Sequence, residues 1–150
     1  LHQMSPLHIA AQFCELRRWR KMPNPNLADI REKTHLKVMS VGCGPCTELA
    51  AIDYMRQTNE LEFETLEFIG IDPLSDVWEP IWADIEDYFG TGIRFLNRSI
   101  LELIDVIVEQ DWVPDLIIFQ YVFSDMYKHN EQRDIEDFIE KLVDFLNKLI

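Results

Sequence analysis

Apolar residues along this chain follow two kinds of pattern that alternate from one end to the other. Four short runs rich in β-branched and aromatic residues predict buried strands, and the stretches around them carry apolar residues at helical spacing. The predicted strands cover 36–41, 65–71, 93–96 and 116–119, with the last continuing toward Val122. The predicted helices cover 6–21, 27–33, 47–59, 75–89, a stretch that begins at Ser99, and 131–150. Strands that alternate with helices predict an α/β fold, a doubly wound parallel sheet with right-handed crossovers.

Two of these helices carry apolar faces with more than one interpretation. In the helix 75–89, aromatic and aliphatic residues recur at helical spacing at Trp78, Ile81, Trp82, Ile85, Tyr88 and Phe89. This spacing favours packing against the sheet over a stacking platform for a base. Pro80 is expected in the first turn or at a kink. The unbroken apolar stripe of 131–150 favours packing on the sheet over docking of a partner helix.

The composition is that of one globular domain. The chain has 150 residues, of which 47% are hydrophobic and 27% are charged, enough for a substantial core. Its three cysteines form no disulfide framework, which favours a reducing compartment. No apolar run reaches the roughly 20 residues that cross a membrane, and the first residues lack the features of a signal peptide. These observations predict a cytoplasmic protein without a membrane span.

The charge is unevenly distributed along the chain. Residues 1–40 contain seven Lys or Arg and three Asp or Glu, whereas residues 41–150 contain seven and 24. An acidic body repels nucleic acid, whose binding needs basic contacts to phosphate. The basic segment is expected to pack beside the acidic body or to form a solvated face, with a contact to nucleic acid as the less favoured alternative. We therefore divide the chain into an N-terminal helical extension, 1–35, and a main domain, 36–150.

A glycine turn joins the first predicted strand of the main domain to the helix that follows. The turn contains Gly42, Cys43 and Gly44. Glycine lets a ligand approach the backbone, and a helix N-terminus presents unpaired N–H groups. The second predicted strand ends at Asp72, 28 residues after Gly44. In nucleotide-binding α/β units an acid at this point accepts hydrogen bonds from ribose, at a usual interval of about 20 residues.

Through these residues, Val-Gly-Cys-Gly-Pro and then Gly-Ile-Asp, the chain resembles the class I S-adenosylmethionine-dependent methyltransferases. The resemblance covers about 36–150. It implies a Rossmann-like sheet of the methyltransferase type, S-adenosylmethionine as the cofactor, and a small molecule or a protein as the methyl acceptor. Complete members of the family have further strands, so the resemblance implies a sheet truncated after the fourth strand and its helix. The remainder of a longer chain, or an oligomer partner, is expected to complete that sheet.

The resemblance also implies which residues contact the cofactor. The backbone of Gly42, Cys43 and Gly44 is expected to hold its methionine end. Asp72 is expected to bind the ribose, and Pro73 beside it to line the slot for the adenine.

Two later segments match positions that contact the adenine and the reacting group. Ser99 matches the polar contact to the adenine, or serves only as a helix cap. Gln120 and Tyr121 follow the fourth strand, where the family has its catalytic loop, and are expected to face the methyl group, with Gln120 also in contact with the cofactor. Asp125 is a general base in one interpretation and a solvated acid in the favoured one.

Two departures from the family pattern keep a second hypothesis open. Ser40 stands where the family usually has an acid, and Cys46 where its third small residue is usually glycine. The alternative function is a module of the same fold that binds a ligand or partner without transferring a methyl group.

A third hypothesis comes from Cys43-Gly-Pro-Cys46, which matches the frame of thioredoxin-like redox proteins, where a low-pKa thiolate sits at a helix N-terminus. The lack of a Trp before Cys43 and the acid at the end of the second strand argue against it. A zinc site would need two further ligands beside this pair, and the histidines show no suitable spacing, so no metal site is predicted.

Overall fold

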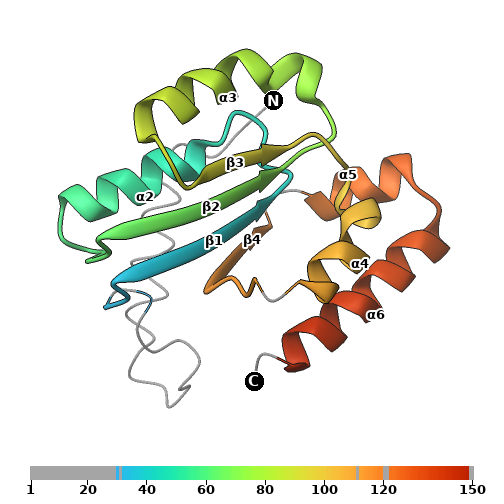
Figure 1. Cartoon of the computed structure of the whole chain (residues 1–150). Coiled ribbons are helices and arrows are strands. Elements are labelled where there is room, and N and C mark those ends of the chain that lie inside the picture. Colours follow the sequence, from blue (N-terminus) through green and yellow to red (C-terminus); the bar gives the residue numbers. More distant parts are fainter. Residues whose placement is uncertain (1–29, 31, 111, 120–121, 149–150) are drawn as a thin grey trace.

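A computed structural model describes residues 30, 32–110, 112–119 and 122–148. Strands and helices alternate along this part of the chain (Figure 1). The strands are β1 (His35–Val41), β2 (Thr65–Ile71), β3 (Ile93–Leu96) and β4 (Leu116–Phe119). The helices are α2 (Thr47–Gln57), α3 (Ser75–Phe89), α4 (Ile100–Glu109), α5 (Val122–His129) and α6 (Gln132–Lys148). None of the described helices is long and apolar enough to cross a membrane.

All four strands are parallel and lie in the order β3-β2-β1-β4. The chain builds the sheet outward from β1 through β2 to β3 and then crosses back to place β4 on the other side of β1. The strand order therefore reverses at β1, and in open α/β sheets ligands bind beyond the carboxyl ends of the strands at such a point. This arrangement is the predicted α/β parallel sheet and is consistent with a Rossmann-like fold.

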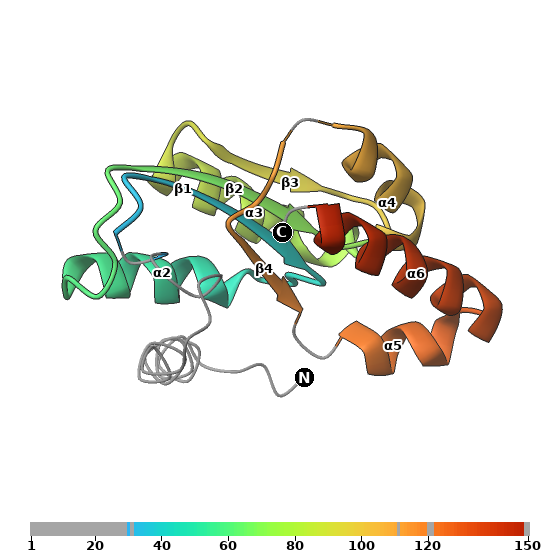
Figure 2. The same cartoon turned by 90° about the horizontal axis from the view of Figure 1, so that it is seen from below.

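Helices cover both faces of the sheet (Figures 1 and 2). Alternate residues of β1 point to opposite faces, as in any strand. Leu36 and Val38 join the apolar core formed with α2 and α3, whereas Met39 and Val41 join the core formed with α4, α5 and α6. Cover on both faces explains why residues 38–41 of β1 are all buried instead of alternating with exposed ones.

The predicted strands and helices agree with the structure except directly after β4 and directly before β1. The continuation of the fourth strand toward Val122 is wrong, because residues 122–129 form α5. Val122 and Met126, four residues apart, point the same way on that helix, and Met126 is buried. The predicted helix 6–21 lies outside the described residues. Of the predicted helix 27–33, residues 30, 32 and 33 are described, and none of them is helical, so that prediction is wrong there.

Helix α3 buries fewer of its apolar residues than the spacing predicted. Trp82 is buried against the sheet, as expected, but Ile81 is 39% and Tyr88 is 73% exposed. The apolar residues cover too wide an arc of the helix for all of them to face one sheet. Pro80 lies at the sixth residue of the helix, which continues through it.

Helix α6 packs onto the sheet through the face that the sequence predicted. Ile135 and Phe138 are fully buried, and the rings of Phe138 and Phe119 of β4 lie 6.4 Å apart. Lys141 adds an ion pair across to Asp105 of α4 at 3.0 Å. Packing on the sheet is therefore the observed role of this stripe.

The replacement Phe138→Ala should lower the free energy of unfolding by about 3–5 kcal/mol, the usual cost of deleting a buried ring. Val143→Ala on the exposed side of α6 should change it by no more than about 0.5 kcal/mol. Urea denaturation of both variants measures these values. Equal losses in the two variants would show that α6 does not pack on the sheet in this way.

Candidate functional site

A cavity of about 480 Å³ lies at the carboxyl ends of β1 and β2, a size typical of small-molecule sites. Its walls come from the ends of both strands, from the segment before α4 and from α5. In Figure 2, α5 lies beyond the arrowheads of the strands. The polar side chains that line it include Asp72, Arg98, Asp125 and His129. The cavity therefore occupies the point of the sheet where the strand order reverses.

The glycine turn after β1 has a left-handed backbone at three positions. Gly42 and Gly44 have φ angles of 68° and 51°, and Cys46 has a φ of 60°. A Cβ atom on Gly42 would lie 2.4 Å from Cγ2 of Val122, so a larger residue would collide with the start of α5. Cys46 adopts a conformation that favours glycine, which is the residue that the resemblance expects there.

The first three amides of the turn donate hydrogen bonds within the fold. The N–H groups of Gly42 and Cys43 donate to the Ile71 carbonyl, at 2.7 and 3.2 Å. The N–H of Gly44 donates to Oδ2 of Asp72 at 2.9 Å. These amides bind the end of β2, so they do not form a cluster of free donors for a phosphate group.

Asp72 connects the glycine turn to the cavity. Its Oδ2 accepts from Gly44, and its Oδ1 accepts from the N–H of Leu74 at 2.8 Å. Its own N–H donates to the Leu96 carbonyl at the end of β3. Asp72 is 93% buried yet lines the cavity. A carboxylate has about four acceptor positions, so lone pairs remain for a ligand after these two bonds.

Trp82 supports the turn from the side of α3. Its indole Nε1–H donates to the Gly44 carbonyl at 2.7 Å. Its ring stacks on Phe95 of β3, with centroids 4.9 Å apart and planes 2° from parallel. The helical spacing predicted this residue as core, but nothing in the pattern indicated a hydrogen bond to the turn, because that bond spans 38 residues of sequence.

Trp82→Phe should remove about 1–3 kcal/mol of stability, because it leaves a buried carbonyl without this donor. Trp78→Phe is the matched control: Trp78 is half-buried on the same helix, and its replacement should cost less. Thermal and urea denaturation of the two variants test the difference. If Trp82→Phe proves no more costly than Trp78→Phe, the indole bond does not hold the turn.

A buried carboxyl lies beneath the turn. Ser40 of β1 points toward the α2 side of the sheet, and its hydroxyl donates to Oε1 of Glu48 in the first turn of α2. Both residues are buried. Burial raises the pKa of Glu48 above its ordinary value of 4.5, and the charge of Asp72 adds to the rise, whereas the Ser40 hydrogen bond opposes it. Sequence reasoning missed Glu48, because only the folded chain brings this carboxyl against Ser40.

The raised pKa of Glu48 means that the folded protein holds this proton more tightly than the unfolded chain does. Glu48 therefore lowers the stability as pH rises from about 4.5 through its raised pKa. The amide of Glu48→Gln does not ionise. The free energy of unfolding of this variant, minus that of the unaltered protein, should therefore rise across this pH window and stay constant above it. Denaturation curves at several pH values measure the gain.

The control for this experiment is Glu140→Gln on the exposed side of α6. It removes one acidic group without touching the turn, so its stability relative to the unaltered protein should vary little over the same range. A constant difference for Glu48→Gln as well would contradict a raised pKa of Glu48 in the folded protein.

The two cysteines of the turn are buried, at 3% and 2% exposure. Burial is the main cause that raises the pKa of the Cys46 thiol well above its ordinary value, and a hydrogen bond with Cys43 raises it further. A redox pair needs an accessible thiolate of low pKa. The geometry of the turn therefore argues against the thioredoxin-like hypothesis.

The structure brings some of the predicted site residues together and separates others. Gly42, Asp72, Pro73 and Ser99 all line the carboxyl-end cavity. The side chain of Cys43 points into the core instead, and Gly44 is a buried residue of the turn that does not line the cavity.

The remaining predicted residues lie after β3 and β4. Ser99 is the cap of α4, since its Oγ accepts from the N–H of Leu101 at 3.2 Å. Asp125 lies on α5 rather than on a loop; it lines the cavity and forms an exposed ion pair with Lys128 at 3.5 Å. Gln120 and Tyr121 fall outside the described residues, so their role stays a prediction. Arg98 and His129 also line the cavity, and the sequence had singled out neither of them as a site residue.

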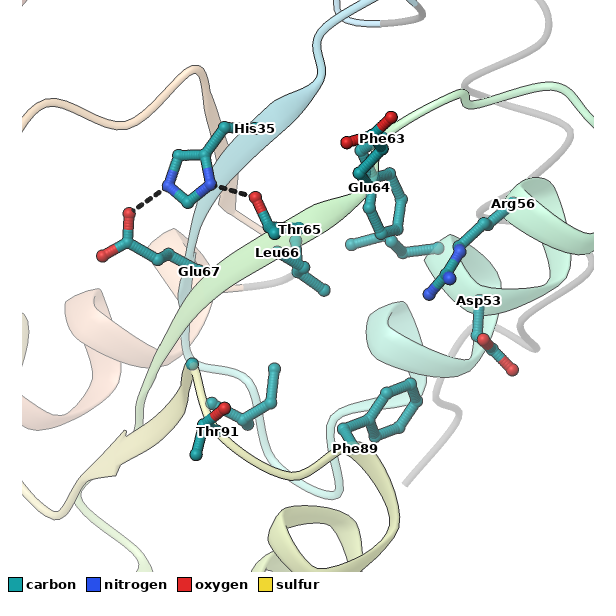
Figure 3. Close-up of a pocket in the computed structure, with 13 residues that line it drawn as sticks. His35, Asp53, Arg56, Phe63, Glu64, Thr65, Leu66, Glu67, Phe89 and Thr91 are labelled. Carbon is teal, nitrogen blue, oxygen red and sulfur yellow. Dashed lines mark hydrogen bonds and ion pairs between the residues drawn. The ribbon is translucent and has the colours of Figure 1, made fainter.

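A second cavity, of about 400 Å³, lies at the opposite, amino end of the strands (Figure 3). Arg56 lies over the ring of Phe63 on one side of it, 5.4 Å from the centroid. On the other side of β2, His35 contacts Thr65 and lies 2.5 Å from Glu67. The hydrogen bond with His35 lowers the pKa of Glu67. None of the predicted site residues lines this cavity, so the carboxyl-end cavity is the candidate site.

Within the part of the chain that the structure describes, no group of three His, Cys, Asp or Glu residues is placed to hold a metal ion. Comparisons with the models of known protein families and with curated proteins found no match for this chain.

Proposed function

We propose that this chain binds S-adenosylmethionine in the carboxyl-end cavity and is a methyltransferase, or the cofactor-binding part of one. The observation that carries the proposal is the position of Asp72, which holds the glycine turn and faces the cavity at once. The resemblance in the sequence rests on the same turn and the same acid. The parallel sheet with its reversal at β1 supplies the arrangement in which those two features meet.

The glycine turn offers no phosphate cradle, and two carboxylates of the cavity suit a ligand with hydroxyl groups or positive charge, while Arg98 and His129 line the same cavity. The amides of Gly42, Cys43 and Gly44 are used within the fold, so the turn offers no phosphate cradle. The carboxylates of Asp72 and Asp125 line the cavity and accept hydrogen bonds from hydroxyls or pair with a cation. Pro73 and Leu74 add an apolar wall for a flat ring.

When bound, S-adenosylmethionine supplies a methyl group on a sulfonium, which needs placement of the acceptor in line more than acid–base groups. The residues of this chain would accordingly bind and orient. Asp72 would hold the ribose hydroxyls through its remaining lone pairs, and Gln120 and Tyr121 would face the methyl group. The acceptor is proposed to be a small molecule or a protein, because the acidic body of the chain disfavours nucleic acid.

Calorimetric titration of the full chain with S-adenosylhomocysteine tests the binding. The unaltered protein should bind saturably, and Asp72→Asn should weaken binding about 10- to 100-fold, since a hydrogen bond to a charged group contributes about 1.5–3 kcal/mol. Asp76→Asn, on the exposed first turn of α3, should bind as the unaltered protein does. Absence of heat at millimolar ligand, or equal affinity for a folded Asp72→Asn, would overturn the proposal.

Binding alone does not distinguish a methyltransferase from a module that only binds the cofactor. Formation of S-adenosylhomocysteine that depends on an added small-molecule or protein acceptor separates the two. Saturable binding without turnover on any acceptor class would favour the binding module. The structural reason to keep this alternative is Cys46, which has a left-handed backbone at a position where the family usually has glycine.

A further inference from the structure

Helix α3 carries a second apolar stripe, which stays exposed beside the face that packs on the sheet. Leu74, just before the helix, is 61% exposed, and Val77, Ile81 and Tyr88 are 57%, 39% and 73% exposed. Steps of three, four and seven residues place these side chains on one side of the helix. The stripe lies beside the face that buries Trp82, so α3 has two adjacent apolar surfaces and the sheet covers only one of them.

Acidic residues border this stripe. Asp76, Asp84 and Asp87 are exposed on the helix, which contains five acidic and no basic residues. Pairing of α3 with α3 of a second copy would bring these acids face to face, and the whole chain has a net charge of −13. The stripe therefore suits an occupant that is both apolar and basic.

We propose that residues 6–21 of this chain dock on the exposed stripe of α3. Their sequence places Ile9, Phe13 and Leu16 on one side of a predicted helix, and it contains four Lys or Arg against one acid. Apolar residues thus meet apolar residues, and the basic groups meet the acidic border. The stripe shares only Leu74 with the carboxyl-end cavity, and the docking stands or falls independently of the cofactor proposal.

The connection between the two segments is compatible with this docking. Ile30, which follows the segment, packs against the same core cluster as Trp78 and Ile85 of α3. The chain therefore leaves the described domain on the face of the sheet that α3 covers. The eight intervening residues, 22–29, span up to about 27 Å when extended. The stripe from Val77 to Tyr88 is about 16 Å long, which is shorter than this span.

Hydrogen–deuterium exchange of the full chain, read by mass spectrometry on peptides from residues 6–21, tests the proposal. In the unaltered protein these amides should exchange at least about 10-fold more slowly than in an unstructured peptide, and Val77→Glu with Tyr88→Glu should abolish that protection. These two positions are the most exposed of the stripe outside Leu74, which also lines the carboxyl-end cavity. The matched control is Val106→Glu with Val143→Glu, at exposed apolar positions of α4 and α6, which should leave the protection unchanged.

A second pair of variants keeps the test decisive if the first pair fails to fold. Asp84→Lys with Asp87→Lys changes only exposed charges and should speed exchange of residues 6–21 several-fold, whereas Glu140→Lys with Asp144→Lys on α6 should not. Sedimentation identifies the occupant: a monomer with protected residues 6–21 supports the proposal. Three results would overturn the proposal. Residues 6–21 could exchange without protection, or their protection could survive both α3 variants. The protein could also form a dimer that the α3 variants dissociate without changing the exchange of residues 6–21.

Discussion

The carboxylate of Asp72 is the contact on which the carboxyl end of this sheet depends. It accepts the N–H of Gly44 from the turn after β1 and the N–H of Leu74 from the start of α3. Two loops that leave neighbouring strands are thereby tied to one side chain. A charged acceptor with two backbone donors forms stronger bonds than a neutral one, and burial keeps water from competing for them. The same carboxylate lines the cavity, so the group that orders the loops is also the group offered to a ligand.

Around that contact, the turn rests on polar groups that have been removed from water. Trp82 donates to the Gly44 carbonyl from one side, and Glu48 accepts from Ser40 beneath. Burying such groups is unfavourable unless each finds a partner, so these pairs hold one conformation of the turn rather than many. The resemblance placed an acid at the end of β1, where this chain has Ser40. Here the nearby carboxyl comes from α2, and burial raises its pKa.

The acidic and basic charges of the chain are unevenly distributed along the sequence. The described domain concentrates acids on exposed helical surfaces such as the outer side of α3, while much of the basic charge precedes β1. Uneven charge of this kind favours contacts between the two parts of a chain and disfavours association of identical surfaces. The apolar stripe of α3 and its acidic border thus form one surface. Packing against the sheet does not account for the apolar residues on it, because the sheet does not cover them.

Local pattern determined most of the architecture. The four strands, the helices from α2 to α4 and α6, the cap at Ser99 and the parallel sheet all follow from short-range periodicity, because burial on one or both faces imposes a period on neighbouring residues. The glycine turn and Asp72 were also evident in the sequence. Only the tertiary structure decided that residues 122–129 form a helix. It also decided that the first three N–H groups of the turn donate to the Ile71 carbonyl and to Asp72, and that Trp82 and Glu48 support the turn. These contacts join residues from 8 to 38 positions apart, and no local pattern records which distant groups the folding of the sheet brings within reach of one another.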